Sequence, residues 1–127
     1  MLSKALTIYM RDYVPGFDWG SANCCHFAAG WVRELTGRDV MAGLPNTPTE
    51  KDSRRLLRVM GGLREAVTKQ SGLPQIAAEF AQVGDVVLSG RSLGICAGRT
   101  SVHVGESGQL VNIDMAHAIC AWRVTCV

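Results

Sequence analysis

The 127-residue sequence lacks the features that mark several large classes of protein. Its formal net charge is only +2 and its basic residues are dispersed, so we expect no nucleic-acid partner. No apolar run approaches the length that spans a membrane. Residues 1–13 lack a sustained apolar core and a small-residue cleavage site, so we expect no signal peptide. There is no internal repeat, low-complexity segment or linker, which predicts one domain over residues 1–127.

The number and spacing of the cysteines argue against a disulfide framework and against a metal site. There are five, an odd number, at positions 24, 25, 96, 120 and 126, and no pair has the C-x-x-C spacing. Without a secretion signal, a disulfide framework is not expected. A zinc or iron–sulfur site would have to be assembled from scattered positions, so we expect no metal and no other cofactor.

What the sequence does contain is typical of a folded domain. Hydrophobic residues make up 47% and charged residues 19%, which excludes a disordered tail. Apolar periodicity and breakers predict helices over residues 2–13, 24–36, 52–60 and 63–70, and a weaker helical or irregular piece over 75–82. We interpret Arg54, Arg55 and Arg58 as a solvated helix face.

The pattern changes to strands at residue 84. Short β-like runs separated by glycine-bearing turns occupy residues 84–90, 93–99, 100–106 and 109–114, and residues 119–127 predict a last strand. Helices therefore come first and a small, mostly antiparallel sheet follows. This order predicts an α+β fold with the N-terminal helices packed on the C-terminal sheet.

The stretch SANCCHFAAGWV opens the second helix with two cysteines. Ser21 or Asn23 can cap the helix, and the apolar stripe turns Cys24 inward and His26 outward. The helix N-terminus favours an anion, so Cys24 is a candidate thiolate nucleophile. The alternative is that Cys24 and Cys25 are small apolar residues that pack the helix onto the sheet.

A cysteine nucleophile needs a base, which is usually histidine. We expect His26 to be a surface residue and His117 to be structural or exposed in a turn before the last strand. Strand alternation places Ser101 and His103 on one face, and Val102 and Val104 on the other. His103 could face Cys24 or water, and the local sequence favours water.

The motifs together resemble a known superfamily. A Trp-Gly loop leads into a cysteine at a helix start, and GDVV and a strand with a central histidine follow much later. This is similar to the papain-like NlpC-type cell-wall cysteine peptidases. The chain more closely resembles small phage and prophage tail-associated proteins related to them. The shared motifs stand at Trp19 to Val32, Thr36 to Asp39, Gly61 to Leu63, Ala81 to Val87, Leu93 to Arg99 and Ala121 to Val124.

The resemblance implies a degenerate catalytic site. It places Cys24 at the nucleophile position, with Asn23 in place of the usual aspartate and Cys25 in place of the usual serine. It places Ser92 where the catalytic histidine should be, and His103 at the third, orienting position. Serine cannot accept a thiol proton near neutral pH as imidazole can. Whether the protein is an enzyme therefore stays open.

The resemblance also implies a biological setting. We expect a structural protein of the phage tail tip, associated with the hub or baseplate, with tail-tip, hub and fibre proteins as partners. Such a protein is made in the bacterial cytoplasm and then becomes part of the virion tail. The first alternative is a cysteine hydrolase of peptidoglycan peptides that acts in cell-wall penetration. The second is a tail-assembly factor that leaves before the virion matures.

Overall fold

A computed structural model of the chain describes residues 2–13, 24–45, 49–105 and 108–124. Four helices come first: α1 (Leu2–Asp12), α2 (Cys24–Thr36), α3 (Glu50–Val59) and α4 (Leu63–Ser71). Six strands follow: β1 (Gln75–Ala77), β2 (Val86–Ser89), β3 (Ser92–Cys96), β4 (Thr100–Val104), β5 (Leu110–Asp114) and β6 (Ala118–Trp122). The predicted α+β order is confirmed. No helix in the described part of the chain is both long and apolar enough to cross a membrane.

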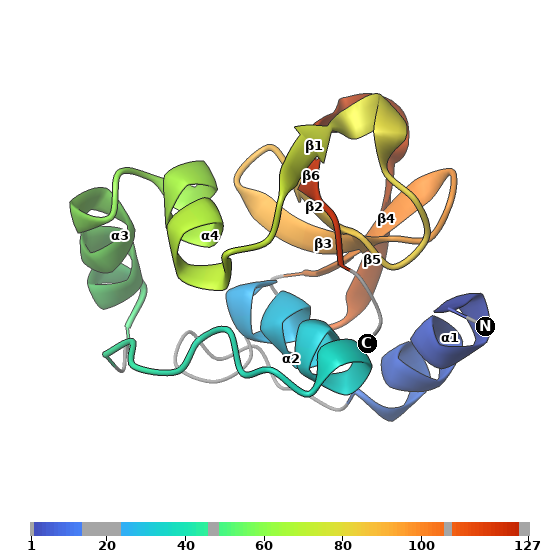
Figure 1. Cartoon of the computed structure of the whole chain (residues 1–127), viewed down its shortest axis with the longest axis horizontal. Coiled ribbons are helices and arrows are strands. Elements are labelled where there is room, and N and C mark those ends of the chain that lie inside the picture. Colours follow the sequence, from blue (N-terminus) through green and yellow to red (C-terminus); the bar gives the residue numbers. More distant parts are fainter. Residues whose placement is uncertain (1, 14–23, 46–48, 106–107, 125–127) are drawn as a thin grey trace.

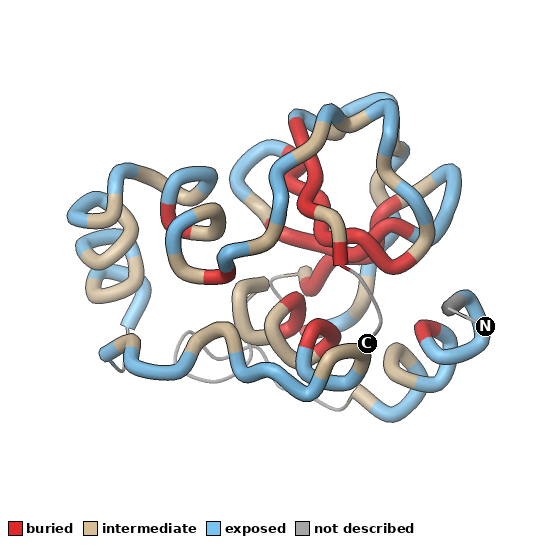
Figure 2. The backbone as a smooth tube through the Cα atoms, in the orientation of Figure 1, coloured by how far each residue is buried: buried red, intermediate tan, exposed pale blue. Residues whose placement is uncertain are grey.

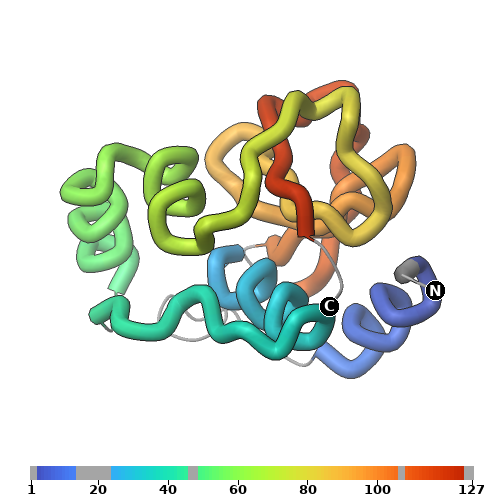
Figure 3. The backbone as a smooth tube through the Cα atoms, in the orientation of Figure 1, coloured from blue at the N-terminus to red at the C-terminus, as the bar shows by residue number. Residues whose placement is uncertain are grey.

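The six strands form one sheet in the order β1-β6-β2-β3-β4-β5. Every pair of neighbouring strands is antiparallel. Strands β2 to β5 follow one another as a meander, whereas β6 returns to lie between β1 and β2. The course of the backbone in Figure 3 shows this return, with the last strand beside the segment that follows α4.

The helices occupy different positions around the sheet (Figure 1). Helix α2 lies against one face of the sheet, mainly at β3 and β4, and α1 packs beside α2. Helices α3 and α4 form a pair at one side of the molecule. Buried residues concentrate in the sheet and in α2 (Figure 2), while none of the ten residues of α3 is buried. All four residues of β2 and four of the five residues of both β3 and β4 are buried, so the middle of the sheet is the most completely buried part of the fold.

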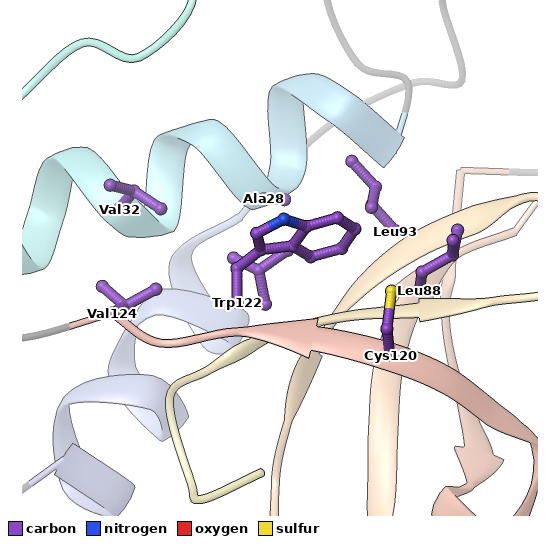
Figure 4. Packing of buried hydrophobic residues seen from close by; sticks show 8 residues of the cluster. Ala28, Val32, Leu88, Leu93, Cys120, Trp122 and Val124 are labelled. Carbon is purple, nitrogen blue, oxygen red and sulfur yellow. The ribbon is translucent and has the colours of Figure 1, made fainter. Parts of the chain in front are cut away.

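The core between α2 and the sheet explains how the start of α2 is held. The indole of Trp122 lies between α2 and the strands, next to Ala28 and Leu93 (Figure 4). Its Nε1 donates a hydrogen bond of 3.0 Å to the hydroxyl of Thr68, which ties α4 to the same cluster. Burial of an aliphatic or aromatic side chain of this size contributes about 1.5–3 kcal/mol. Cys24 and Cys25 pack against this cluster.

The small residues of α2 allow α1 to approach closely. The hydroxyl of Tyr9 donates to the carbonyl of Phe27 at 2.7 Å, and a side chain on Gly30 would collide with that hydroxyl. Helix α2 ends where the sequence predicts, because Gly37 adopts φ 77°, in the left-handed region that favours glycine. The proposed caps Ser21 and Asn23 lie outside the described residues.

Two predictions about local structure are wrong. Helix α3 begins at Glu50 rather than at residue 52, because Thr49 caps it: the Thr49 hydroxyl accepts from the Asp52 N–H at 3.1 Å. Residues 75–77, predicted to be helical or irregular, form strand β1 because they pair with β6. A 3₁₀ turn, Ala78–Phe80, follows. The strand depends on a partner far along the chain, which local propensity does not reveal.

Candidate functional site

Helix α2 places Cys24 at its first turn, close to the start of β3. Phe27, Ala28, Trp31 and Val32 of α2 are buried against the sheet, and the predicted stripe is confirmed. Because the stripe holds the helix in a fixed rotation, the half-buried Cys24 comes to the edge of the core rather than its centre.

Interactions with neighbouring donors, among them the main-chain N–H of Cys24 itself, lower the pKa of the Cys24 thiol. The largest effect comes from the Cys25 thiol, and the Leu93 N–H and the Ser92 hydroxyl add to it, while burial opposes them. Together they lower the pKa of Cys24 to about 7. The pKa of Cys25 is raised well above its usual value, because its proton is held by Cys24 and its thiol is buried. Cys24 is thus the acidic member of the pair and the better nucleophile near neutral pH.

Ser92 also contacts the imidazole of His103. The Ser92 hydroxyl lies 2.9 Å from His103 Nδ1, and the Ser101 hydroxyl lies 2.7 Å from Nε2. Both ring nitrogens therefore have a serine partner. Neutral imidazole donates through one nitrogen and accepts through the other, and a hydroxyl can serve either role.

The expectation that His103 faces water is wrong, because its side chain is only 1% exposed. The predicted alternation of β4 itself is confirmed: Val102 and Val104 pack in the cluster with Phe27, whereas Ser101 and His103 lie on the other face. That face is covered too. The ring lies against β3 at Gly94, where a Cβ atom would stand 2.5 Å from Nε2.

Burial gives His103 a neutral character. Loss of hydration lowers the pKa of its imidazole, and an interaction with the Leu93 main chain opposes this only in part. Ser92 contacts both Cys24 and His103, so the three residues that the resemblance implies lie together, with Ser92 in the middle. The imidazole reaches the sulfur through the serine hydroxyl.

Sequence reasoning missed two members of this site. One is the Leu93 main-chain N–H, which only the three-dimensional position of β3 places beside the sulfur. The other is Tyr13, whose hydroxyl oxygen is buried and has no hydrogen-bond partner among the residues described here. Burial raises the pKa of Tyr13, and the nearby Cys24 charge raises it further. In the sequence Tyr13 is only one apolar position of an amphipathic helix, so no signal distinguishes it.

The other predicted polar residues lie elsewhere. His26 is half-buried on α2 rather than at the surface, and it makes contacts of its own. His117 is exposed on the 3₁₀ turn before β6, as expected. The arginines of α3 are exposed, as predicted for a solvated face, and Arg54 pairs with Glu50 at 2.6 Å. Within the described ranges, no three His, Cys, Asp or Glu side chains are grouped so that they could hold a metal ion.

The aspartate of the GDVV motif has a structural role. Asp85 is 2% exposed and accepts hydrogen bonds from the main-chain N–H groups of Gln82 and Val124 at 2.9 and 3.1 Å. It also forms an ion pair of 3.0 Å with Arg123. These bonds attach the segment after β6 to the turn before β2, so Asp85 stabilises the sheet away from Cys24.

Comparison with known proteins gives a family without an assigned activity. No protein with a curated function matches the chain. The model of a family described as a domain of unknown function, DUF6950, matches residues 3–124. The matched range includes every strand and nearly all of the first helix, together with Tyr13, Cys24, Ser92 and His103. The chain therefore belongs to the DUF6950 family.

Proposed function

We propose that this protein is a structural component of a phage tail tip with a papain-like fold and a catalytically degenerate site. The resemblance of its motifs to small tail-associated proteins supports the setting. The observation that carries the degeneracy is the position of Ser92. A serine occupies the place beside Cys24 where the resemblance requires the catalytic histidine.

The surroundings of His103 support the same conclusion. Amide hydrolysis by a cysteine requires a group that takes the thiol proton and later delivers a proton to the leaving amine. His103 is buried, and both of its nitrogens have serine partners at 2.9 Å or less. An imidazole held in this way has no access to an amine that leaves from Cys24. The usual contribution of a positioned acid–base group is about 10²–10⁴ in rate.

Restoring the histidine tests the degeneracy. We expect the wild-type protein to leave cross-linked and linear peptidoglycan peptides intact, and Ser92→His to gain measurable hydrolysis. The double variant Ser92→His with Cys24→Ala is the matched control, since it has the base without the nucleophile. Hydrolysis by the wild type at a rate equal to or above that of Ser92→His would overturn the degeneracy.

Location tests the tail-tip role. We expect the protein in purified virions of a phage that encodes it, in a fixed ratio to the tail-tip hub protein, by quantitative mass spectrometry. Its absence from virions but presence in cells that assemble tails would favour the assembly factor. Its absence from both would overturn the tail assignment.

The second candidate function is a cysteine hydrolase of peptidoglycan peptides, and one observation favours it. Cys24, Ser92 and His103 form a continuous chain, and Ser92 could pass a proton from the thiol to His103 Nδ1 while it gives up its own. Hydrolysis that both Ser92→Ala and His103→Gln abolish, while Cys24 remains alkylatable, would establish this function. Equal inactivity of all three proteins would exclude it.

A further inference from the structure

Strand β5 is an open edge of the sheet. In the strand order β1-β6-β2-β3-β4-β5 it pairs only with β4, and three of its five residues are exposed. The strand at the other edge, β1, has only three residues and leads directly into a 3₁₀ turn. An open edge presents a row of main-chain N–H and C=O groups that can pair with another strand. Of the two edges, β5 therefore offers the longer template.

The hydrogen bonds at the two ends of the β4–β5 pair show which groups of β5 are free. The Gly105 N–H donates to the Gln109 carbonyl at 2.8 Å. At the other end, the Met115 N–H donates to the Arg99 carbonyl at 2.9 Å. Because alternate residues of an antiparallel strand face the partner with both main-chain groups, the odd-numbered residues of β5 bond to β4. The main-chain groups of the even-numbered residues point to the open side, where no main-chain group of the described residues bonds to them: Leu110, Asn112 and Asp114.

The side chains of β5 leave apolar surface at this edge. Val111 lies opposite His103 in the register and Ile113 lies opposite Ser101, so both are on the face of the buried imidazole. Val111 is 38% exposed, although the histidine opposite it is buried. Leu110 is on the other face, where it packs with the buried residues of α1 and α2. The strand contains no lysine, arginine or proline, which are the residues that commonly protect an open edge from pairing.

We propose that β5 pairs antiparallel with β5 of a second copy of this chain, and that the two sheets join into one about a two-fold axis at Asn112. Asn112 then lies opposite its own copy, and Leu110 lies opposite Asp114 of the partner subunit. Every free N–H and C=O group of the three even-numbered residues gains a partner in this register. A shift of two residues in either direction would leave some of these groups unpaired.

The side chains of β5 agree with this register. Val111 lies opposite Ile113 of the partner subunit, so apolar side chains meet on the face of His103. Asp114 does not meet its own copy, so no like charges oppose each other. The contact is isologous and closes after two copies, whereas pairing of β5 with the short β1 would not close. A contact of this length is at the low end of interface sizes, so we expect a dimer in exchange with the monomer. Self-pairing of β5 does not depend on the tail-tip role.

Hydrogen exchange of the full chain, resolved by residue with NMR, tests the pairing. The protein would be compared at roughly 10 µM and at roughly 1 mM, with its mass followed by sedimentation velocity. We expect the amides of Leu110, Asn112 and Asp114 to exchange at least about threefold more slowly at the higher concentration, as a dimer appears. The amides of Val111 and Ile113 already bond to β4, so their rates should change less. A monomer at the higher concentration, or no change at the three outward amides, would overturn the proposal. Protection that appears only when another protein is added would assign the edge to a foreign strand and would also overturn it.

Opposite charges at Asn112 test the two-fold register. Asn112→Lys alone and Asn112→Asp alone place like charges opposite each other, so each should stay monomeric at low ionic strength. An equal mixture of the two variants should form a heterodimer, which native mass spectrometry distinguishes from either homodimer. Val59→Lys and Val59→Asp carry the same charges at an 80% exposed position of α3, and each should dimerise as the wild type does. Thermal unfolding of every variant shows that its monomer is folded. A dimer of Asn112→Lys alone, a mixture that stays monomeric, or loss of the dimer in the Val59 variants would contradict the proposal.

Discussion

Replacement of Cys25 by alanine should remove the main cause of the acidity of Cys24. The Cys25 thiol is the largest of the effects that lower the pKa of Cys24 from 9.0 to about 7, and burial works in the opposite direction. Without the thiol, the pKa should rise toward its usual value of 9.0. The ionised fraction at pH 7 is about one half at a pKa of 7 and about one in a hundred at a pKa of 9. We therefore expect alkylation of Cys24 at pH 7 to slow by at least about tenfold.

The assay is the rate of iodoacetamide modification of Cys24 between pH 5.5 and 9.5, followed by mass spectrometry of the peptide that contains it. The wild-type midpoint should lie near pH 7. Cys25→Ser is the matched control, because its hydroxyl can still donate to the sulfur, so its midpoint should stay well below that of Cys25→Ala. At pH 9.5 all three proteins should react at similar rates, since Cys24 is then ionised in each.

Two results would refute this reasoning. A wild-type midpoint near 9 would mean that Cys24 has no special stabilisation, and it would remove the support for a nucleophile at this position. A midpoint that Cys25→Ala leaves unchanged, but that His103→Gln raises by more than one unit, would mean that the imidazole pairs directly with the sulfur. The arrangement with Ser92 between them would then be wrong.

Three further predictions concern stability. Burial lowers the pKa of His103 below 6.5, so protonation of the imidazole favours the unfolded chain. The free energy of unfolding, measured with urea, should be greatest above pH 6.5 and should fall as the pH drops through the folded-state pKa. His103→Gln should flatten this part of the pH profile. Gly94→Ala should cost about 2–4 kcal/mol in the same assay, since the new Cβ displaces the His103 ring from both serines; a cost under about 1 kcal/mol would contradict this packing. Asp85→Ala should lower the unfolding free energy by about 3 kcal/mol. Arg123→Ala should lower it by less, because Asp85 then keeps its two main-chain donors. Equal losses would mean that the ion pair dominates.

The parts of the fold that local sequence determines were predictable. Helix α2 has an apolar stripe and a glycine at its end, and both appear where the spacing places them. The runs that become strands β2 to β5 either alternate apolar and polar residues or are largely apolar, and glycine turns separate them. All four form strands in the structure. Strand β1 has three residues and exists because β6 lies beside it, so no local pattern could reveal it.

The resemblance pointed to three side chains of the candidate site, Cys24, Ser92 and His103, but not to the geometry that joins them. Alternation correctly separates His103 from Val102, yet it cannot say whether the second face of a sheet is covered. Here that face is covered, and Gly94 provides the space for the ring. The role of the Leu93 N–H depends on where β3 begins relative to α2, which is a tertiary relation. Tyr13 approaches Cys24 for the same reason.

Stabilisation of the thiolate and transfer of the proton belong to different residues in this site. Cys25, the Leu93 N–H and Ser92 favour the charged sulfur, whereas the imidazole of His103 is held by two serine hydroxyls. If the proposed degeneracy holds, a chain with this arrangement keeps a reactive cysteine without the ability to cleave amides. The reactivity of Cys24 toward iodoacetamide and toward peptides should then differ far more than in an enzyme whose histidine touches both the sulfur and the leaving group. The ratio of these two rates, in the wild type and in Ser92→His, measures how completely the two functions are separated.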